Sequence, residues 1–277
     1  MFTRGNLSVP NEVFHIKGDR SNDEDLKKIS DHSFDLIVDS SGRKLEDTQR
    51  LLQFSGLPSF RFIYISSAGV YDNTQFFPVG EESQIDIESR HIGKAKTEFW
   101  LKEQGIPFTS FRPTYIYGPG NYNPIEKWFF DRITHCRSIP IPLDGQVVTQ
   151  LGHVSDLADA ISKSIETDKA NNQIYNCSGG KAVTFKGLIQ TAILATGNKV
   201  SDFDLRSFNP SKLDPKARKL FPLRLTNFFT DISKIKKDLS WQPKFDLLNG
   251  LKDSYENDYQ LVNHKNIDFS SDELLFD

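Results

Sequence analysis

Arg90, Lys94 and Glu98 are spaced four residues apart, and a helix over Ser89–Glu103 would place them on one face. A guanidinium stays protonated and offers no proton acceptor, so Arg90 cannot act as a general base. Arg90 and Lys94 one turn apart would repel by about 0.2–0.5 kcal/mol unless an anion lies between them. The spacing leaves two interpretations: a solvated pair near Glu88 or Glu98, or a site that holds phosphate.

A second group of side chains suited to a charged partner lies late in the chain. Between Ser211 and Arg224, basic residues are opposed only by Asp214, and Phe221 lies among them. Clustered cations bind phosphates, and exposed aromatic rings stack on unpaired bases. A solvated charged face with buried phenylalanines gives the same pattern, so both interpretations stay open. The predicted nucleic-acid surface consists of Arg132, Arg137, Lys212, Lys216, Arg218, Lys219 and Arg224.

The sequence contains no motif that is typical of a metal site or of a nuclease centre. It contains no HxH motif, no CxxC pair and no tight cluster of acidic residues. We interpret His153, near Asp156, as a satisfied histidine at a strand end rather than as a metal ligand. Cys136 and Cys177 are isolated, which is typical of buried thiols in a reducing compartment. We therefore predict no metal site, and we assign no residues to RNA cleavage.

The elements that must position these groups alternate between strands and helices. This alternation predicts a parallel sheet wound with crossover connections. We predict an α/β Rossmann-type, doubly wound core over residues 1–179 and a small C-terminal α+β domain over 180–277, to which residues 116–149 contribute. The predicted strands are 13–19, 34–39, 60–65, 108–112, 150–154 and 173–177, and the predicted helices are 23–29, 46–54, 89–103, 128–136 and 156–166.

The front of the chain departs from a complete dinucleotide-binding fold. Such a fold opens with a strand, a GxGxxG turn and a helix whose N-terminus faces the pyrophosphate. Residues 1–5 instead look like the end of a second strand. A lost central strand would remove about 1.5–3 kcal/mol per buried side chain from a net stability of about 5–15 kcal/mol. We hypothesise that the first strand and its Gly-rich turn are missing; a rearranged N-terminus is the alternative.

Bulk composition bounds the location and the partners. The 277 residues carry a net charge of −3, so nucleic-acid binding would require a local basic face. No apolar run approaches the ~20 residues that cross a bilayer, and the N-terminus has no signal-peptide character. We predict no membrane partner and a bacterial cytoplasmic location, or the plastid stroma if a transit peptide is missing from this chain.

Four blocks, in order, resemble the extended short-chain dehydrogenase/reductase family, which includes NAD-dependent epimerases and dehydratases. In that family a tyrosine four residues before a lysine exchanges a proton with the substrate carbinol. The resemblance implies that Ser67 contacts a substrate hydroxyl and that Lys94 is the lysine, while Arg90 replaces the tyrosine. Oxidoreduction by the usual mechanism is therefore not expected. The blocks are Tyr64–Tyr71 (SSAxVYG), Phe111–Gly120 (RPxxxYGPG), Gly152–Ile161 (HVxDxAxAI) and Trp241–Leu251 (WxPxxxLxxGL).

The same resemblance implies a cofactor site. Arg4 would follow the second strand, where an arginine meets a 2′-phosphate and favours NADP over NAD. An aspartate at position 19 lies near the adenine in similar proteins, although a surface arginine and a turn aspartate would explain both residues. Because the Gly-rich turn is missing, we expect NADP or NAD binding to be weakened or absent. The predicted cofactor positions are Arg4, Asp19, Ser66, Lys94, Arg112 and Pro113.

A narrower family resembles the whole chain, namely the chloroplast stem-loop binding proteins, most closely their b-type and cyanobacterial members. This resemblance implies RNA binding, endoribonuclease activity at stem-loops, and association with ribosomes and transcripts in plastids. The matching blocks are Ser89–Lys94, Tyr115–Phe130, Gln150–Val154, Lys219–Arg224, Asn227–Phe229 and Ile267–Leu275.

Three functions stay open at this stage. The first is an RNA-binding protein, associated with transcripts or ribosomes, on a dehydrogenase scaffold that has lost its chemistry. The second is an NAD(P)-dependent sugar-nucleotide epimerase, dehydratase or reductase in which Tyr115 or Tyr117 replaces the missing phenol. The third is a nucleotide-sensing or scaffolding protein. Extended family members often pair through a four-helix interface, so we also expect a homo-oligomer by analogy.

Overall fold

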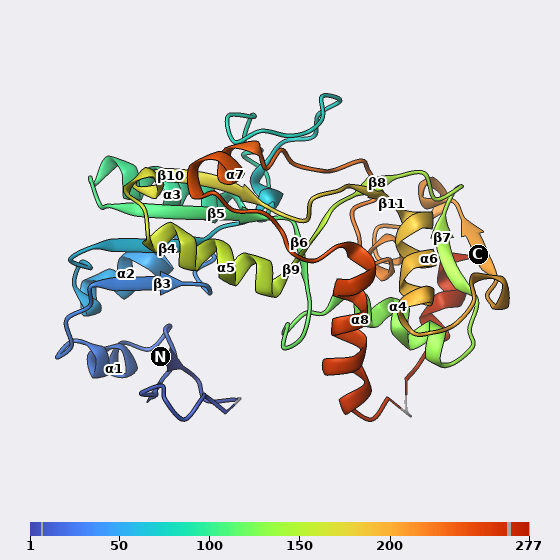
Figure 1. Cartoon of the computed structure of the whole chain (residues 1–277), viewed down its shortest axis with the longest axis horizontal. Coiled ribbons are helices and arrows are strands. Elements are labelled where there is room, and N and C mark those ends of the chain that lie inside the picture. The colour runs from blue at the N-terminus through green and yellow to red at the C-terminus, as the bar shows by residue number, and fades with distance from the viewer. Residues whose placement is uncertain (7, 265–266, 277) are drawn as a thin grey trace. The chain divides into compact units, whose positions relative to one another are not determined.

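The main sheet of the protein is parallel over three of its four strands, β3 (Leu36–Asp39), β4 (Arg61–Ile65) and β5 (Phe108–Pro113). The computed structural model describes residues 1–6, 8–264 and 267–276. The strand order is β10-β5-β4-β3, where β10 is Gln173–Cys177. The α/β architecture with a parallel sheet, predicted from the sequence, is confirmed (Figure 1).

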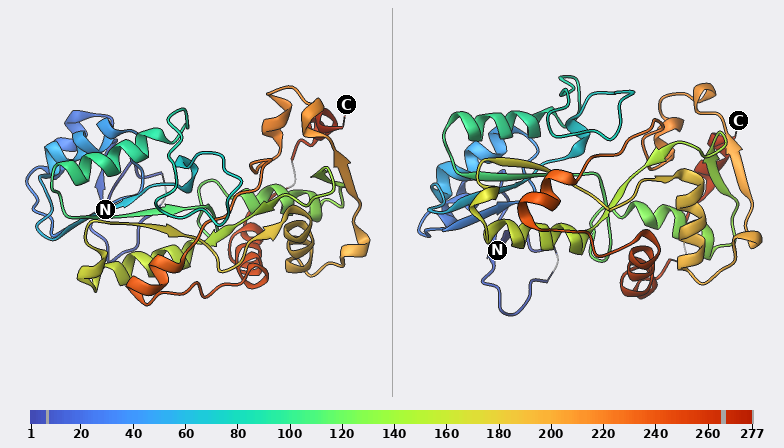
Figure 2. Two further views of the ribbon diagram at one scale, coloured as in Figure 1. Left: turned by 90° about the horizontal axis from the view of Figure 1, so that it is seen from above. Right: turned by 45° about the horizontal axis from the view of Figure 1, so that its top comes forward.

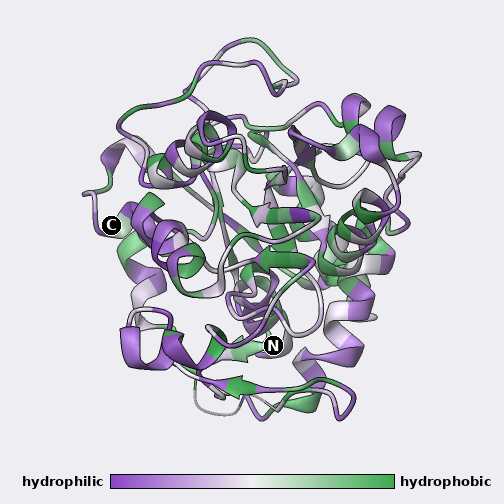
Figure 3. Ribbon diagram, turned by 90° about the vertical axis from the view of Figure 1, so that its left-hand side faces the viewer, coloured by the Kyte–Doolittle hydropathy of each residue, from purple (hydrophilic) through white to green (hydrophobic). Residues whose placement is uncertain are grey.

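Strand β4 forms the interior of this sheet. Phe62 and Tyr64 are fully buried, as expected for a parallel strand that has neighbours on both sides. The helices α2 (Leu45–Ser55) and α3 (Ile92–Glu103) cover one face of the sheet (Figure 2), and Leu52 packs into the cluster around the two aromatic rings. Figure 3 shows the same division by hydropathy, with apolar colour on the strands and polar colour on the outer helix surfaces.

The N-terminal segment forms a small sheet of its own. Strand β1 (Phe2–Thr3) pairs in parallel with β2 (Ile16–Lys17), and a short helix α1 (Asp23–Leu26) with a 3-10 turn η1 (Lys27–Ile29) follows. The predicted strand over residues 13–19 is thus shorter than expected. In the described part of the chain, β3 has a sheet neighbour on one side only. The hypothesis of a missing first strand stays a prediction.

The chain forms two compact units. The first comprises residues 1–74, 81–112 and 164–175, and the second comprises 75–80, 113–163 and 176–277. Residues 150–163 group with the second unit, whereas the sequence pattern assigned them to the first. The physical reason is that this segment packs on C-terminal residues: the buried Trp241 donates its indole N–H to the Asp156 carbonyl over 3.1 Å.

The second unit contains three short strand pairs and most of the later helices. β6 pairs in parallel with β9, β7 in parallel with β12, and β8 antiparallel with β11. The strand bounds are β6 Tyr115–Tyr117, β7 Ile139–Pro142, β8 Val148–Thr149, β9 Leu151–His153, β11 Val183–Thr184 and β12 Leu205–Phe208. The helix bounds are α4 Ile125–Thr134, α5 Val154–Ile165, α6 Phe185–Ala195, α7 Ser233–Leu239 and α8 Leu247–Asn257.

Aromatic side chains fill the core of the second unit. Phe129 and Phe130 of α4, Phe185 of α6 and Phe221 belong to one buried cluster. The region after residue 198, which looked irregular in the sequence, contains α7, α8 and three 3-10 turns used below, η5 (Pro210–Lys212), η6 (Ala217–Leu220) and η8 (Ser270–Leu275). None of the helices in the described residues is long and apolar enough to cross a membrane.

One buried ion pair ties α3 to β5. The Arg112 guanidinium contacts the Glu98 carboxylate at 2.7 Å, and both side chains are almost fully buried. The Ser110 hydroxyl donates a further hydrogen bond to Glu98 over 2.7 Å. Removing one partner would leave the other as an uncompensated buried charge, which is more costly than losing the pair as a whole.

We therefore expect Arg112→Ala to lower the free energy of unfolding by about 3–5 kcal/mol, measured by urea denaturation. Lys27→Ala is the control, since Lys27 pairs with Glu24 at the surface, and it should unfold like the parent. An Arg112→Ala variant as stable as the parent would contradict the assigned role of this pair.

Candidate functional site

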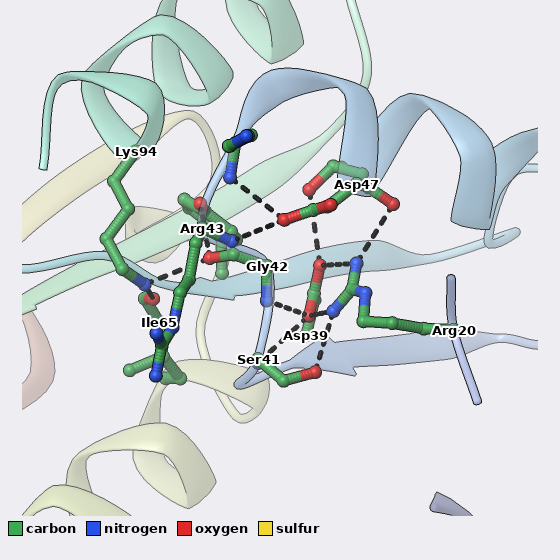
Figure 4. A network of polar contacts seen from close by, with 11 residues as sticks. Arg20, Asp39, Ser41, Gly42, Arg43, Asp47, Ile65 and Lys94 are labelled. Carbon is green, nitrogen blue, oxygen red and sulfur yellow. Dashed lines mark hydrogen bonds and ion pairs between the residues drawn. The ribbon is translucent and has the colours of Figure 1, made fainter. Parts of the chain in front are cut away.

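In the first unit, the polar side chains that could bind a ligand lie at the carboxyl ends of β3 and β4. Parallel α/β sheets bind ligands at this edge, because the loops that leave the strands converge there. The loop after β3 contains Ser41 and Gly42, and β4 is followed directly by Ser66 and Ser67. The first turn of α3 brings Lys94 to the same place (Figure 4).

Asp39, the last residue of β3, holds this edge together. Its carboxylate accepts two hydrogen bonds from Arg20, at 2.6 and 3.0 Å, and one from the Gly42 backbone N–H at 2.9 Å (Figure 4). Although burial acts to raise it, the pKa of Asp39 is held below its ordinary value by the Arg20 hydrogen bonds and charge. A Cβ at Gly42 would lie 2.6 Å from the Asp39 carboxylate, so the close turn requires glycine.

Lys94 is held by two backbone carbonyls. Its Nζ donates to the Ile65 carbonyl over 2.6 Å and to the Gly42 carbonyl over 3.1 Å (Figure 4). Burial lowers the pKa of Lys94 to about 8. The charges of Asp39 and Glu98 oppose this effect, and the smaller effects of Arg43 and Arg20 add to it. The pKa of Lys94 is therefore close to neutral pH, and an anion bound nearby would favour the protonated form of the lysine.

The two serines after β4 have different environments. The Ser67 Oγ accepts the Gly69 N–H over 3.0 Å and caps a 3-10 turn at Ala68–Val70. Ser66 is 3% exposed, and its hydroxyl has no partner among the described residues. Its backbone N–H donates to the Phe111 carbonyl over 2.7 Å. Of the two, Ser66 is the one whose hydroxyl lacks a hydrogen-bond partner in the described residues.

Arg90 does not lie on α3, which corrects the predicted helix over Ser89–Glu103. The helix begins at Ile92, because the Ser89 hydroxyl donates to the Gly69 carbonyl over 2.7 Å and accepts the His91 N–H over 3.1 Å. Arg90 is exposed in the turn before the helix, and its Nε donates to the His91 ring over 3.0 Å. The predicted repulsion between Arg90 and Lys94 on one helix face therefore does not apply.

The other predicted cofactor residues separate into two groups. Arg4 is exposed after β1, and its charge helps to lower the pKa of Asp19, below the larger effect of the Ser21 hydrogen bonds. Those two residues thus lie near each other. Arg112 is committed to Glu98, and Pro113 is the last residue of β5.

The predicted RNA surface is only partly exposed. Lys212, Lys216, Arg218 and Lys219 are exposed on η5, on η6 and between them, whereas the Arg224 guanidinium packs over the Phe228 ring at 4.6 Å. The aromatic rings of this region are mostly core, since Phe221 is 3% exposed. We therefore attribute the segment's binding capacity to its charges.

Arg132, in the last turn of α4, and Arg137, just after the helix, have different environments. Arg137 is exposed, with its guanidinium over the Phe269 ring at 5.4 Å. Arg132 is 6% exposed, pairs with the buried Asp272 and stacks on Trp128 at 3.4 Å. Its charge is satisfied inside the protein, so Arg132 stabilises the C-terminal segment instead of facing a ligand.

Asp39, Arg20 and Arg43 are site residues that were not predicted from the sequence. A usable signal for Asp39 was its position, because a charged residue directly after a buried parallel strand points at the ligand-binding edge. The partners of Asp39 come from β2 onward and from α2, so their spacing in the sequence carries no signal. In the described ranges, no group of three His, Cys, Asp or Glu side chains is arranged to hold a metal ion.

Comparison with known proteins bears on this site. The NAD dependent epimerase/dehydratase family model matches residues 6–178. The chloroplast stem-loop binding protein of 41 kDa b from Arabidopsis thaliana is 41% identical over 267 residues, which cover 95% of this chain and 70% of the relative. A UDP-glucose 4-epimerase from Vibrio cholerae is 28% identical over 69% of this chain and 61% of its own length.

Solved structures show the same fold. The UDP-glucose 4-epimerase of Thermotoga maritima, solved with UDP-glucose, has a TM-score of 0.75 and 21% identity, and covers 95% of this chain and 91% of its own. RMD from Pseudomonas aeruginosa, complexed with NADPH, has a TM-score of 0.72 and 16% identity, and covers 94% of this chain and 99% of its own. At these identities the likeness concerns the fold.

The lowered pKa of Lys94 predicts a pH-dependent stability. Between about 8 and the ordinary lysine value of 10.5, the unfolded chain binds this proton more tightly than the folded protein does. The loss of folding stability caused by burying the protonated Lys94 is fully present below pH 8 and disappears as the pH rises through this window. The parent should therefore gain about 1–3 kcal/mol of unfolding free energy relative to Lys94→Met across the window.

The measurement is urea denaturation of parent and Lys94→Met at stepped pH. The two proteins are compared by the slope of their unfolding free energy against pH. Their absolute stabilities also differ, because the substitution leaves the Gly42 and Ile65 carbonyls without the lysine as donor. Stability curves that run parallel from pH 7 to pH 10.5 would show that Lys94 titrates normally.

Proposed function

Because this chain belongs to the NAD dependent epimerase/dehydratase family, and within it to the chloroplast stem-loop binding proteins, we propose that it binds RNA. The observation that carries the proposal is the exposed basic segment from Lys212 to Lys219 in the second unit. The relative that is 41% identical is named for stem-loop binding, and its chain aligns along 95% of this one.

The charges of this segment are available to a polyanion. Lys212, Lys216 and Lys219 are exposed, and the Arg218 Nε is held by the Leu213 carbonyl at 3.0 Å, which orients its guanidinium. The one acid among them, Asp214, accepts backbone N–H groups at 2.6 and 2.9 Å, so its carboxylate is turned into its own loop. Each phosphate contact releases counterions, which makes such binding dependent on salt.

Hydride chemistry of the family's usual kind does not fit the residues present. Arg90 stands where the tyrosine would, and the alternative phenols are committed elsewhere. The Tyr115 hydroxyl accepts the Arg224 N–H over 2.8 Å. Burial raises the pKa of Tyr117, which is the opposite of the change that a proton-exchanging phenol needs. We infer that the scaffold has lost its oxidoreductase role.

A nicotinamide dinucleotide is the second candidate ligand, since two residues fit its ribose end. Ser66 offers a buried hydroxyl without a partner in the described residues, and Lys94 binds the carbonyl of the residue before it. Arg112 does not fit, because Glu98 occupies it, and the printed sequence holds no GxGxxG pattern. NADP or NAD would supply hydride transfer when bound.

The remaining expectations follow from the same proposal. Transcripts or ribosomes are the RNA partners that we propose, and a second copy of the chain is the proposed protein partner. The relative is named as chloroplastic, so we propose the plastid stroma or a bacterial cytoplasm as the compartment. An endoribonuclease activity would be an addition to RNA binding, and we assign no residues to it.

Reversing three charges tests the proposal. The variant Lys216→Glu, Arg218→Glu, Lys219→Glu should bind a hairpin RNA at least tenfold more weakly than the parent, measured by fluorescence anisotropy against salt. The slope of log affinity against log salt should fall by about 0.7–0.9 per lost phosphate contact.

A matched control variant reverses the same number of positive charges in the first unit. Lys96, Lys102 and Lys169 are exposed there, and their replacement by glutamate should leave the salt slope nearly unchanged. If both triple variants lose affinity equally, net charge alone drives the binding and the basic segment is not the RNA surface. If neither the parent nor the control binds hairpin RNA, the proposed function is wrong.

A further inference from the structure

A small hollow lies in the second unit beside the basic segment. Its volume is about 270 Å³, just below the roughly 300 Å³ at which pockets for drug-sized ligands begin. Three stretches far apart in the sequence line it: the turn Cys136–Ser138 after α4, Arg206 of β12, and the C-terminal turn η8 with Phe276. The size suits one ring system.

The hollow offers both donors and an acceptor. Arg137 is exposed, and the Arg206 side chain is 48% exposed. The Glu273 carboxylate is 62% exposed and forms an ion pair with Arg206 at 3.6 Å. This distance is beyond that of a hydrogen bond, so the donors of Arg206 and the carboxylate oxygens keep capacity for hydrogen bonds to a ligand. Asp272 also lines the hollow, but its carboxylate is committed to the buried Arg132.

Planar groups border the hollow as well. The Arg206 guanidinium lies over the Phe276 ring at 3.8 Å, and the Arg137 guanidinium lies over Phe269 at 5.4 Å. Each ring fixes the plane of its arginine, which reduces the rotamer freedom lost on binding. RNA-binding proteins stack unpaired bases on aromatic rings and on guanidinium planes of this kind.

Guanine is the base whose edges match these groups. Its O6 and N7 are adjacent acceptors that an arginine fork contacts in a bidentate manner. Its N1–H and N2–H₂ are adjacent donors that a carboxylate can accept together. Adenine presents no such donor pair, and the pyrimidines lack N7. A fork such as Arg137 and the Glu273 carboxylate in one hollow therefore favour guanine over the other bases.

The neighbouring surface can bind the phosphates of the same nucleotide strand. Turn η6 packs against η8, so the exposed Arg218 and Lys219 of η6 lie next to the wall of the hollow. A strand that passed along these cations could place one base in the hollow without being bent around the protein. The two parts would act differently, because the cations bind any sequence while the hollow selects a base.

We propose that this hollow binds a single unpaired guanine of an RNA loop. The inference rests on the proposed RNA-binding function and names the base that it selects. Arg206 and Arg137 contact the base edge or its plane, and the Glu273 carboxylate accepts its N1 and N2 protons. Cys136 is a bystander at the rim.

Cys136 provides a built-in reporter. It is exposed in the lining of the hollow, whereas Cys177 is 2% exposed, so a maleimide reagent should modify Cys136 selectively. The rate of this modification is measured with hairpin RNAs that differ only in one loop base: guanine, inosine or adenine. The guanine hairpin should slow the modification about tenfold, and inosine, which lacks the N2 amine, should protect less.

Variants assign the protection to named groups. Glu273→Gln should remove the difference between guanine and inosine, and Arg206→Ala should abolish protection. Neither should change the salt slope that the basic segment produces. Arg50→Ala, a partly exposed arginine paired with Asp23 in the first unit, is the matched control and should protect like the parent.

The outcomes separate the two proposals. Hairpins that bind in a salt-dependent manner but leave Cys136 modification unchanged, or protect it equally with adenine, overturn the guanine site and leave RNA binding intact. Hairpins that do not bind overturn the proposed function. In that case, protection of Cys136 by guanosine monophosphate, but not by adenosine monophosphate, would retain the base site as one for a free nucleotide.

Discussion

The carboxylate of Asp39 fixes the edge of the sheet on which the remnant site is built. Buried at the end of β3, it binds Arg20 and the backbone N–H of Gly42, and this holds the Gly42 carbonyl where Lys94 reaches it. Burial of the lysine at this edge lowers its pKa to about 8, although the charges of Asp39 and Glu98 act to raise it. A charge that is poorly satisfied by the protein itself is suited to an anionic ligand.

Hydride chemistry in this family depends on a phenol that can exchange a proton near neutral pH, and burial moves the pKa of Tyr64 and Tyr117 away from that range. Arg90 is permanently charged and turned toward His91. The phenols that remain buried are shifted in the wrong direction; burial raises the pKa of Tyr71 to about 12. The surface of the second unit has a different character, with exposed cations on η5 and η6 beside a hollow that combines two arginines and a carboxylate. Recognition of a polyanion requires such groups, whereas hydride transfer does not.

Much of the first unit could be predicted from the sequence, because local rules govern it. Apolar runs gave the strands β3, β4 and β5, and helical spacing gave α2 and the body of α3. The predictions failed where distant residues decide the outcome. Helix α3 starts late because Ser89 bonds to Gly69, and Arg132 is buried because Asp272, 140 positions away in the chain, pairs with it. The hollow beside η8 joins three separate stretches, so no local pattern could reveal it. The sequence pattern predicts which residues form one helix or strand, but it does not predict which side chains of different elements contact each other.

We propose that this scaffold lacks hydride chemistry because Arg90, a permanently cationic residue, replaces in the sequence the tyrosine that the family uses to exchange a proton. It is tested most directly by a single-turnover assay of the purified protein, in which a UDP-sugar and NAD or NADP are mixed and the reduced nicotinamide is followed by absorbance. The nicotinamide spectrum should not change beyond the change seen in a protein-free mixture. Rapid hydride transfer that Lys94→Met abolishes would contradict it.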